Sequence, residues 1–271
     1  AAKDTTAAAA DSGSTAAADS GSATGDVTAD VQKIIDAGVL KVGVKTDVPC
    51  FSLLNTATGE YEGLEDDLAY NIAGKIFGCT PDEAKEKKLV EFQGVTAKTR
   101  GPLVENGELD MVIATFTITE ERKETYNFST PYFTDAVGLL VLKDSGINSI
   151  EDLDGKVIGV AQGSTSQKGF EAYVAEKGIN VKPTFEEFDG YPALAAALSA
   201  KNIDVFSVDR AILAGYRDDT NKLLDDRYAE QEYGVCTKKE NTGLAELVDG
   251  VVTDLKDSGK LAEMIKDWGI E

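Results

Sequence analysis

Short apolar runs alternate with longer amphipathic segments along nearly the whole chain, and this alternation restricts the fold more than any other feature of the sequence. The short runs have the length and the branched side chains typical of strands, whereas the longer segments repeat apolar residues with the helical period. Strands are predicted at residues 39–44, 89–92, 110–114, 137–142, 156–160, 181–188, 204–208 and 233–237. Helices are predicted at residues 31–37, 66–77, 166–177, 191–201, 244–256 and 261–268. Such alternation predicts open α/β sheets.

The length of 271 residues is enough for two compact units, each with its own core. We expect an α/β protein of two lobes, each a mostly parallel sheet flanked by helices, joined by hinge strands near residues 133–135 and 230–233. The last strand and the last two helices have no partner strands nearby in sequence, so we expect them to return to the first lobe. The expected boundaries are 27–133 and 232–271 for lobe 1, and 134–231 for lobe 2.

Residues 1–26 consist almost entirely of Ala, Thr, Ser, Asp and Gly, with no aromatic or branched aliphatic side chain before Val27. A segment of this composition cannot bury enough apolar surface to fold, and as a random coil it would span roughly 30 Å. We expect a disordered tether of a lipoprotein whose lipidated cysteine lies upstream of this sequence, so that a lipid anchor is the only link to a membrane. A frayed terminus without function is the alternative.

The charge and the cysteines exclude several classes of partner. With 48 acidic against 27 basic residues, the net charge of -21 argues against nucleic acid or an anionic membrane surface. No apolar run has the roughly 18 residues that a membrane span needs. Cys50, Cys79 and Cys236 lack close spacing and the chain has no histidine, so we expect no metal site and no cofactor. One disulfide with one thiol, or three thiols, both remain open.

Polar side chains follow four predicted strands at the point where each strand ends. They lie at residues 45–47, 115–117 and 162–165 and at Asp209. Ligands of open α/β sheets bind beyond the carboxyl ends of the strands. Together the four positions predict one cleft between the two lobes.

The segment 110–122 gives that cleft a chemical character. An apolar strand, whose residues 111–113 we assign to the core, runs into the hydroxyl side chains of Thr115 and Thr117 and then reaches Arg122. A guanidinium offers a planar fork that matches a carboxylate, and hydroxyls add directional donors. We therefore predict a receptor for a small carboxylate, although hydroxyls near the start of a helix also serve as simple caps.

With these residues in view, the chain from about residue 30 onward resembles the periplasmic binding protein superfamily, and within it the polar amino-acid-binding proteins of ABC importers. The matching stretches are residues 61–69, 110–122, 160–165 and 203–209. Residues 42–49 and 97–103 resemble the branch that binds aspartate and glutamate. The resemblance implies the two-lobed type II fold of that superfamily.

The resemblance also implies roles for individual residues. Arg122 and Thr117 would hold the α-carboxylate of an amino acid, assisted by Thr165 from the other lobe. Asp209 would take the α-ammonium. The predicted ligand-binding residues are Lys45, Arg100, Thr115, Thr117, Arg122, Ser164, Thr165, Tyr191 and Asp209.

Lys45 and Arg100 would be additional cations beside the pocket, and two such cations are poorly tolerated unless an anionic group of the ligand neutralises them. We therefore expect an acidic side chain on the ligand. The alternatives are a solvated lysine, a surface ion pair of the arginine, and a packing role for Tyr191. Asp67 and Asp204 are assigned to structure, as a helix cap and a strand start.

The predicted protein is a monomeric extracytoplasmic binding protein, periplasmic or a cell-surface lipoprotein, which captures aspartate or glutamate between closing lobes and delivers it to an ABC permease. Glutamine or cystine as ligand, a cyclohexadienyl dehydratase-like enzyme and an adhesin are the alternatives. The absence of histidine removes most general-base arrangements and argues against an enzyme. The choice between aspartate and glutamate, and whether Cys50 or Phe51 lines the cleft, remain open.

Overall fold

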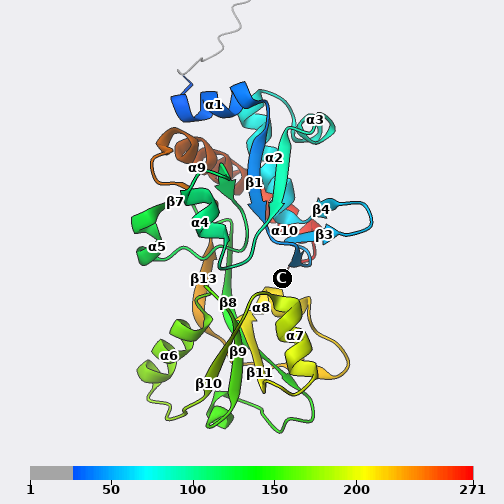
Figure 1. The fold of residues 1–271 in the computed structure, drawn as a ribbon, viewed down its shortest axis with the longest axis vertical. Helices are drawn as coiled ribbons and strands as arrows, with labels where there is room; N and C mark the ends of the chain where they lie inside the picture. Colours follow the sequence, from blue (N-terminus) through cyan, green and yellow to red (C-terminus); the bar gives the residue numbers. More distant parts are fainter. Residues whose placement is uncertain (1–26, 271) are drawn as a thin grey trace, which may run out of the picture.

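The computed structural model describes residues 27–270, which form two lobes stacked along the long axis of the molecule (Figure 1). The predicted tether at residues 1–26 lies outside the described residues. Among residues 27–270, none of the helices combines the length and the apolar content that crossing a membrane requires. The expectation of a two-lobed α/β fold is confirmed.

Lobe 1 is built on a five-stranded sheet with the order β5-β1-β6-β14-β7. Its strands are β1 (Leu40–Val44), β5 (Val90–Gly94), β6 (Met111–Val112), β7 (Tyr126–Phe128) and β14 (Cys236–Lys238). β1 is fully buried except at Lys41 and runs parallel to both β5 and β6. A small second sheet contains β2 (Asp47–Val48), β3 (Ser52–Asn55) and β4 (Glu60–Glu62).

The helices of lobe 1 cover its main sheet. They are α1 (Ala29–Ala37), α2 (Leu64–Phe77), α3 (Pro81–Glu86), α4 (Arg100–Glu105), α5 (Glu120–Thr125), α9 (Thr242–Asp257) and α10 (Lys260–Asp267). α9 packs against α1 and α2, and Asp30 accepts a hydrogen bond from the Leu244 amide at 2.8 Å. Because β14, α9 and α10 all lie in this lobe, the predicted return of the C-terminal segment is confirmed.

Lobe 2 contains a six-stranded sheet with the order β10-β9-β11-β8-β12, and β13 also pairs with β8. Its strands are β8 (Phe133–Leu142), β9 (Val157–Ala161), β10 (Thr184–Phe188), β11 (Val205–Asp209), β12 (Asn221–Leu223) and β13 (Tyr228–Tyr233). Its helices are the 3₁₀ turn η1 (Ile150–Leu153), α6 (Ser166–Lys177), α7 (Tyr191–Ser199) and α8 (Arg210–Ala214).

Both sheets are mixed, which corrects the expectation of mostly parallel sheets. β9 is parallel to β10 and β11, but β8 is antiparallel to β11, β12 and β13. The reason is the connection between the lobes. β8 and β13 carry the chain across in opposite directions, so they enter the lobe 2 sheet as an antiparallel pair (Figure 1).

The crossing strands also explain why the strand predicted at 233–237 is two strands. β13 ends at Tyr233 and β14 begins at Cys236, so the predicted run spans the passage between the lobes. Phe133 and Tyr233 are paired in register at the crossing. The lobe boundaries at 133/134 and 231/232 stay a prediction.

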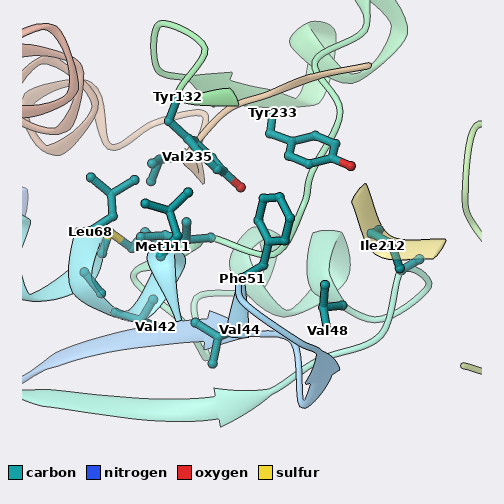
Figure 2. Packing of buried hydrophobic residues seen from close by; sticks show 14 of the residues in the cluster. Val42, Val44, Val48, Phe51, Leu68, Met111, Tyr132, Ile212, Tyr233 and Val235 are labelled. Carbon is teal, nitrogen blue, oxygen red and sulfur yellow. The ribbon is translucent and has the colours of Figure 1, made fainter. Parts of the chain in front are cut away.

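Phe51 packs on this crossing (Figure 2). Its ring meets Phe133 edge-on at a centroid distance of 5.2 Å and Tyr233 at 5.9 Å, and it is 1% exposed. Cys50 is exposed with φ of 69°, and all three cysteines are free thiols. Phe51 therefore belongs to the aromatic core at the strand crossing, and the chain has three thiols instead of a disulfide.

Asp67 does not cap a helix, so that prediction is wrong. α2 begins at Leu64 after the N-cap residue Gly63, which places Asp67 in the first turn of the helix and not at its cap. Its Oδ2 instead accepts a hydrogen bond from Trp268 Nε1 at 2.8 Å, joining α2 to the C-terminal end of α10. Asp204 lies immediately before β11 and accepts from the Val157 amide at 2.8 Å, in keeping with a structural role.

Gly63, which precedes α2, should be essential for stability. A Cβ at this position would lie 2.0 Å from the Phe51 carbonyl oxygen. That oxygen also accepts from the Glu65 amide at 2.9 Å, so it has no room to move. We expect Gly63→Ala to lower the free energy of unfolding by about 3 kcal/mol, measured by urea denaturation. Gly250→Ala is the control, since a Cβ added there would meet nothing within 4 Å apart from the adjacent backbone of its own helix.

In that control position, inside α9, alanine is expected to be neutral or to stabilise by up to about 1 kcal/mol. Equal unfolding curves for the two variants would contradict the proposed steric conflict at Gly63.

Candidate functional site

The structure divides the nine predicted ligand-binding residues into two neighbouring groups. The buried group, Lys45, Arg100, Thr115, Tyr191 and Asp209, lies where the lobes meet, and each member is at most 5% exposed. The cavity group, Thr117, Arg122, Ser164 and Thr165, lines a cavity of about 910 Å³ between the lobes. Both groups combine residues from lobe 1 and lobe 2.

Thr115 and its neighbours owe their position to a turn after β6. Thr115 has φ of 45°, which is unusual for a branched side chain, and the turn is held by Glu65 from the first turn of α2. Glu65 Oε1 accepts from the Thr115 amide at 2.6 Å and from the Tyr132 hydroxyl at 2.5 Å. The buried carboxylate thus fixes the backbone that carries the hydroxyl residues.

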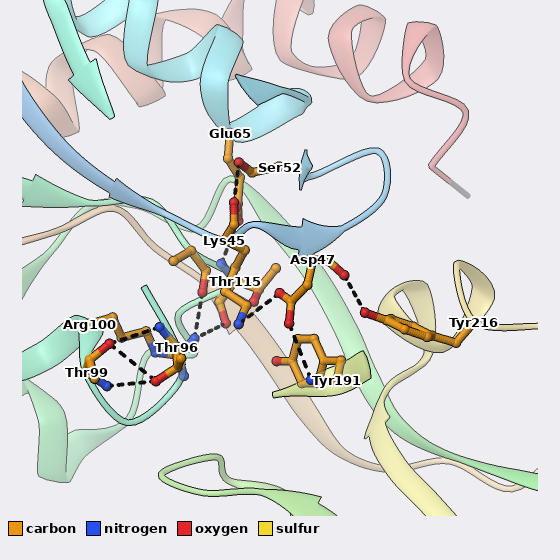
Figure 3. A network of polar contacts seen from close by, with 11 residues as sticks. Lys45, Asp47, Ser52, Glu65, Thr96, Thr99, Arg100, Thr115, Tyr191 and Tyr216 are labelled. Carbon is orange, nitrogen blue, oxygen red and sulfur yellow. Dashed lines mark hydrogen bonds and ion pairs between the residues drawn. The ribbon is translucent and has the colours of Figure 1, made fainter. Parts of the chain in front are cut away.

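Arg100 is the first residue of α4 and braces the same turn from the other side (Figure 3). Its Nη1 donates to the carbonyls of Ala114 at 2.6 Å and Thr115 at 3.0 Å. Its Nε is buried without a hydrogen-bond partner. The guanidinium lies over the ring of Phe116, 4.1 Å from the ring centroid. Arg100 is a buried cation at the site, which excludes the surface ion pair considered as its alternative.

Lys45 is buried as well, but it has a partner within its own loop. Its Nζ lies 3.1 Å from Asp47 Oδ1 and 4.5 Å from the centroid of the Tyr191 ring (Figure 3). Burial lowers the pKa of Lys45, and the Asp47 carboxylate opposes that shift. The premise that Lys45 is an uncompensated cation is therefore wrong.

Asp47 also makes contacts from lobe 1 to lobe 2. Its Oδ2 accepts from the Tyr191 amide at the start of α7, at 3.3 Å. Its backbone carbonyl accepts from the Tyr216 hydroxyl at 2.6 Å. Tyr191 stands over Lys45 and packs against Phe206 and Tyr216, so it has both a site position and a packing role.

Asp209, at the end of β11, is the acceptor of the buried group. Its Oδ2 accepts a hydrogen bond from the hydroxyl of Tyr233, at the end of the crossing strand β13. Burial raises the pKa of Asp209 to about 7, while the nearby Arg100 and Arg122 favour the ionised form. A cationic ligand group would act in the same direction as those two arginines.

Arg122 bridges the lobes. Its Nη1 donates to the Thr117 carbonyl at 2.7 Å, and its Nη2 donates to the Gly163 carbonyl in lobe 2 at 3.1 Å. The guanidinium lies 4.6 Å from the centroid of Phe116, so that ring is in contact with two arginines. Burial, and the neighbouring Arg100, lower the pKa of Arg122 to about 9.

Gly163 allows this close approach. Its φ is 79°, and a Cβ there would lie 3.0 Å from the Ala97 carbonyl oxygen of lobe 1. A further contact between the lobes is an exposed ion pair between Lys168 and Glu121, with 2.9 Å between nitrogen and oxygen. The loops that carry the site are therefore in direct contact across the cleft.

The hydroxyls of Thr117 and Thr165 converge on a residue that the sequence did not reveal. Both donate to Oε1 of Gln231 on β13, at 2.7 Å and 2.6 Å. Ser164 lies beside them and lines the same cavity. The site thus gathers hydroxyl donors from both lobes around one oxygen atom.

Several other site residues were not predicted. Glu65 and Asp47 lie within stretches that the sequence marked, but their contacts depend on tertiary packing. Phe116 stands between Thr115 and Thr117, and its contact with two arginines was not predicted. Gln231 and Tyr233 lie in the predicted hinge strand 230–233, but their contacts with Thr117, Thr165 and Asp209 depend on the folded chain and not on local sequence.

The buried carboxylates predict how stability depends on pH. Burial raises the pKa of Glu65 to about 7 and that of Asp66 to about 8, well above the values of about 4 in an unfolded chain. The folded protein therefore binds more protons than the unfolded chain between these values. The stabilisation is complete below about pH 4 and is lost as the pH rises through about 7 to 8.

We expect the urea midpoint to fall as the pH rises from about 4 to about 8, and Glu65→Gln to flatten that dependence. Glutamine keeps an oxygen that can accept from Thr115 and Tyr132. Glu246→Gln, at an exposed position of α9, removes one surface charge and is the control. An identical pH dependence in the two variants would show that Glu65 ionises normally.

Known proteins resemble this chain in sequence and in fold. Residues 40–271 match the family described as bacterial extracellular solute-binding proteins, family 3. The glutamine-binding protein of Geobacillus stearothermophilus is 41% identical over 216 residues, which are 79% of this chain and 78% of that protein. The ABC transporter glutamine-binding protein GlnH of Bacillus subtilis (strain 168) is 35% identical over 238 residues, 87% of this chain and 82% of that protein.

Among solved structures, a mutant of ArgBP from T. maritima superposes with a TM-score of 0.75 at 27% identity. That match covers 89% of this chain and 100% of the other.

Proposed function

Because the chain belongs to the bacterial extracellular solute-binding proteins of family 3, we propose that it captures a free polar amino acid between its lobes and delivers it to an ABC permease. The observation that carries this proposal is the opposition of charges across the cleft. Arg122, with the hydroxyls of Thr117 and Thr165, offers donors for a carboxylate. The buried Asp209 offers an acceptor for an ammonium group, and a free amino acid has both groups on one carbon.

We propose glutamine as the preferred ligand. Lys45 is paired with Asp47, so it does not require an anionic ligand group as counter-ion. The site's three cations, Lys45, Arg100 and Arg122, are matched by three carboxylates. These are Asp47, Glu65 and Asp209. A net-neutral zwitterion with an amide side chain suits that balance, and the two relatives described above are named glutamine-binding.

Glutamate is the second candidate, and aspartate the third. One observation favours an acidic side chain, since the buried Nε of Arg100 has no hydrogen-bond partner. The pKa values of Glu65 and Asp209, both raised to about 7, also favour an acidic side chain on the ligand. Protonation of either carboxyl would leave the site with an excess of positive charge, which an acidic ligand would neutralise.

The proposed mechanism is closure without chemistry. A ligand that contacts residues of both lobes stabilises the closed state by its higher affinity for that state, and β8 and β13 carry the bending. The permease would recognise the closed form. A monomeric state and a lipid anchor upstream of the sequence remain part of this proposal.

Isothermal titration calorimetry tests the proposal. Refolded, ligand-stripped protein would be titrated with glutamine, glutamate, aspartate, cystine and arginine. Tight one-to-one binding of glutamine, with glutamate weaker, is the expected result. Tighter binding of glutamate would make glutamate the preferred ligand. No binding of any amino acid would refute the proposal. Turnover of prephenate or arogenate would reveal an enzyme instead.

A further inference from the structure

The amide of Gln231 joins the two lobes where the hydroxyl donors of the site converge. Its Oε1 accepts from Thr117 of lobe 1 at 2.7 Å and from Thr165 of lobe 2 at 2.6 Å. Its Nε2 donates to the Ala229 carbonyl at 2.8 Å. The side chain is 2% exposed and lines the same cavity as Arg122. Both polar atoms of the Gln231 side chain are therefore hydrogen-bonded, at the centre of the proposed carboxylate receptor.

A hydroxyl has one proton to donate. While Thr117 and Thr165 donate to Gln231, neither can donate to a carboxylate of the ligand. The amide oxygen thus takes the place, in hydrogen-bonding terms, that a carboxylate oxygen would take. Two acceptors, one internal and one from the ligand, compete for the same pair of donors.

Gln231 also lies on the strand that connects the lobes. It pairs with Asp135 in the register of β13 and β8. Its Nε2 is bound to a carbonyl at an irregularity of this pairing, between Tyr228 and Glu230, where Ala229 has φ of 47°. Release of the amide would therefore change both the contact between the lobes and the irregular part of the hinge strand.

We infer that Gln231 is an internal competitor of the ligand, which links the lobes through Thr117 and Thr165 and is displaced when the ligand carboxylate takes those hydroxyls. The inference rests on the proposed function, because it takes the ligand to be an amino acid held by the same donors. When the ligand displaces it, the buried amide oxygen of Gln231 loses two hydrogen bonds. This cost lowers the affinity for the ligand. The competing amide also reduces the fraction of molecules ready to accept ligand.

Two substitutions with opposite expected effects test the inference. Gln231→Leu removes the competing acceptor, and we expect roughly tenfold tighter binding of glutamine by calorimetry. Gln231→Glu supplies a stronger acceptor whose negative charge repels the ligand carboxylate, and we expect roughly tenfold weaker binding near pH 8 that recovers as the pH falls. Gln32→Leu is the control, since Gln32 is exposed on α1 outside the cavity and donates to Asp36 within that helix.

Weaker or unchanged binding by Gln231→Leu would overturn the inference, because it would mean that the amide supports the site. Gln231→Met, which has the same length, repeats the test if leucine lowers the melting temperature. Small-angle X-ray scattering of ligand-stripped protein adds a readout that needs no ligand. We expect a larger radius of gyration for Gln231→Leu than for the wild type, and equal values would overturn the inference. If the wild type binds no amino acid, the proposed function fails and the competition fails with it. The scattering comparison then still decides whether Gln231 links the lobes.

Discussion

Replacement of Arg122 by methionine is expected to weaken the binding of every amino acid by roughly a thousandfold. A carboxylate bound to a guanidinium makes charge-assisted hydrogen bonds, which contribute more than neutral ones. Lys168, which also lines the cavity, is paired with Glu121 and does not replace them. Arg122 also links Thr117 to Gly163 across the cleft, so its loss removes a contact that closure uses. Because the α-carboxylate is common to all amino acids, the loss should not depend on the ligand's side chain.

Calorimetry with glutamine and glutamate measures this effect, and the melting temperature of the unliganded variant shows whether it folds. Arg217→Met, at an exposed position after α8, removes the same charge without touching the cleft and should bind like the wild type. If the Arg122 variant bound glutamine within about tenfold of the wild type, the carboxylate would have to lie elsewhere.

Replacement of Asp47 by asparagine is expected to shift the preference from glutamine toward glutamate by roughly ten- to a hundredfold. The substitution keeps the shape of the side chain and an oxygen that can accept from the Tyr191 amide. It removes the counter-ion of Lys45, which is 1% exposed. A buried lysine without a counter-ion is costly, and the carboxylate of a glutamate side chain would neutralise it.

This effect should itself depend on pH. Burial already lowers the pKa of Lys45, and loss of Asp47 lowers it further, so the lysine carries its charge below the new pKa and loses it above. The preference for glutamate should therefore be largest above the pKa of about 4 of the ligand's own carboxyl and below the new lysine pKa, and should fade as the pH rises above the latter. Asp189→Asn is the control, because Asp189 is exposed in the loop before Tyr191. Equal selectivity in both variants would mean that Lys45 and Asp47 do not face the ligand's side chain.

The positions of the strands and helices were largely readable from the sequence, because apolar periodicity depends on local residues. The helix predicted at 166–177 is α6, Ser166–Lys177, and Gly38 ends α1 in the left-handed conformation. The orientation of the strands was not readable. It depends on β8 and β13 crossing between the lobes, which periodicity does not encode.

The chemistry of the site was predicted in part for the same reason. Strand ends marked Thr117, Thr165 and Asp209. The structure brings Thr117 and Thr165 together on Gln231, and Asp209 accepts from Tyr233 on the same strand. Their role in binding a ligand stays a prediction. Gln231 is separated from Thr117 by 114 residues in sequence, so their hydrogen bond exists only in the folded chain. The prediction of an acidic ligand treated Lys45 as a cation without a counter-ion. Asp47, two residues away, is that counter-ion. The sequence alone does not show which neighbouring charge a buried lysine contacts.

A crystal structure of the refolded protein with glutamine would show directly which residues hold the ligand. We expect glutamine between the lobes, with its α-carboxylate within about 3 Å of Arg122 and of the hydroxyls of Thr117 and Thr165. The ammonium should contact Asp209, and Gln231 should no longer accept from the two hydroxyls. Glutamine bound with its side-chain amide at Arg122, or outside the space between the lobes, would contradict the account.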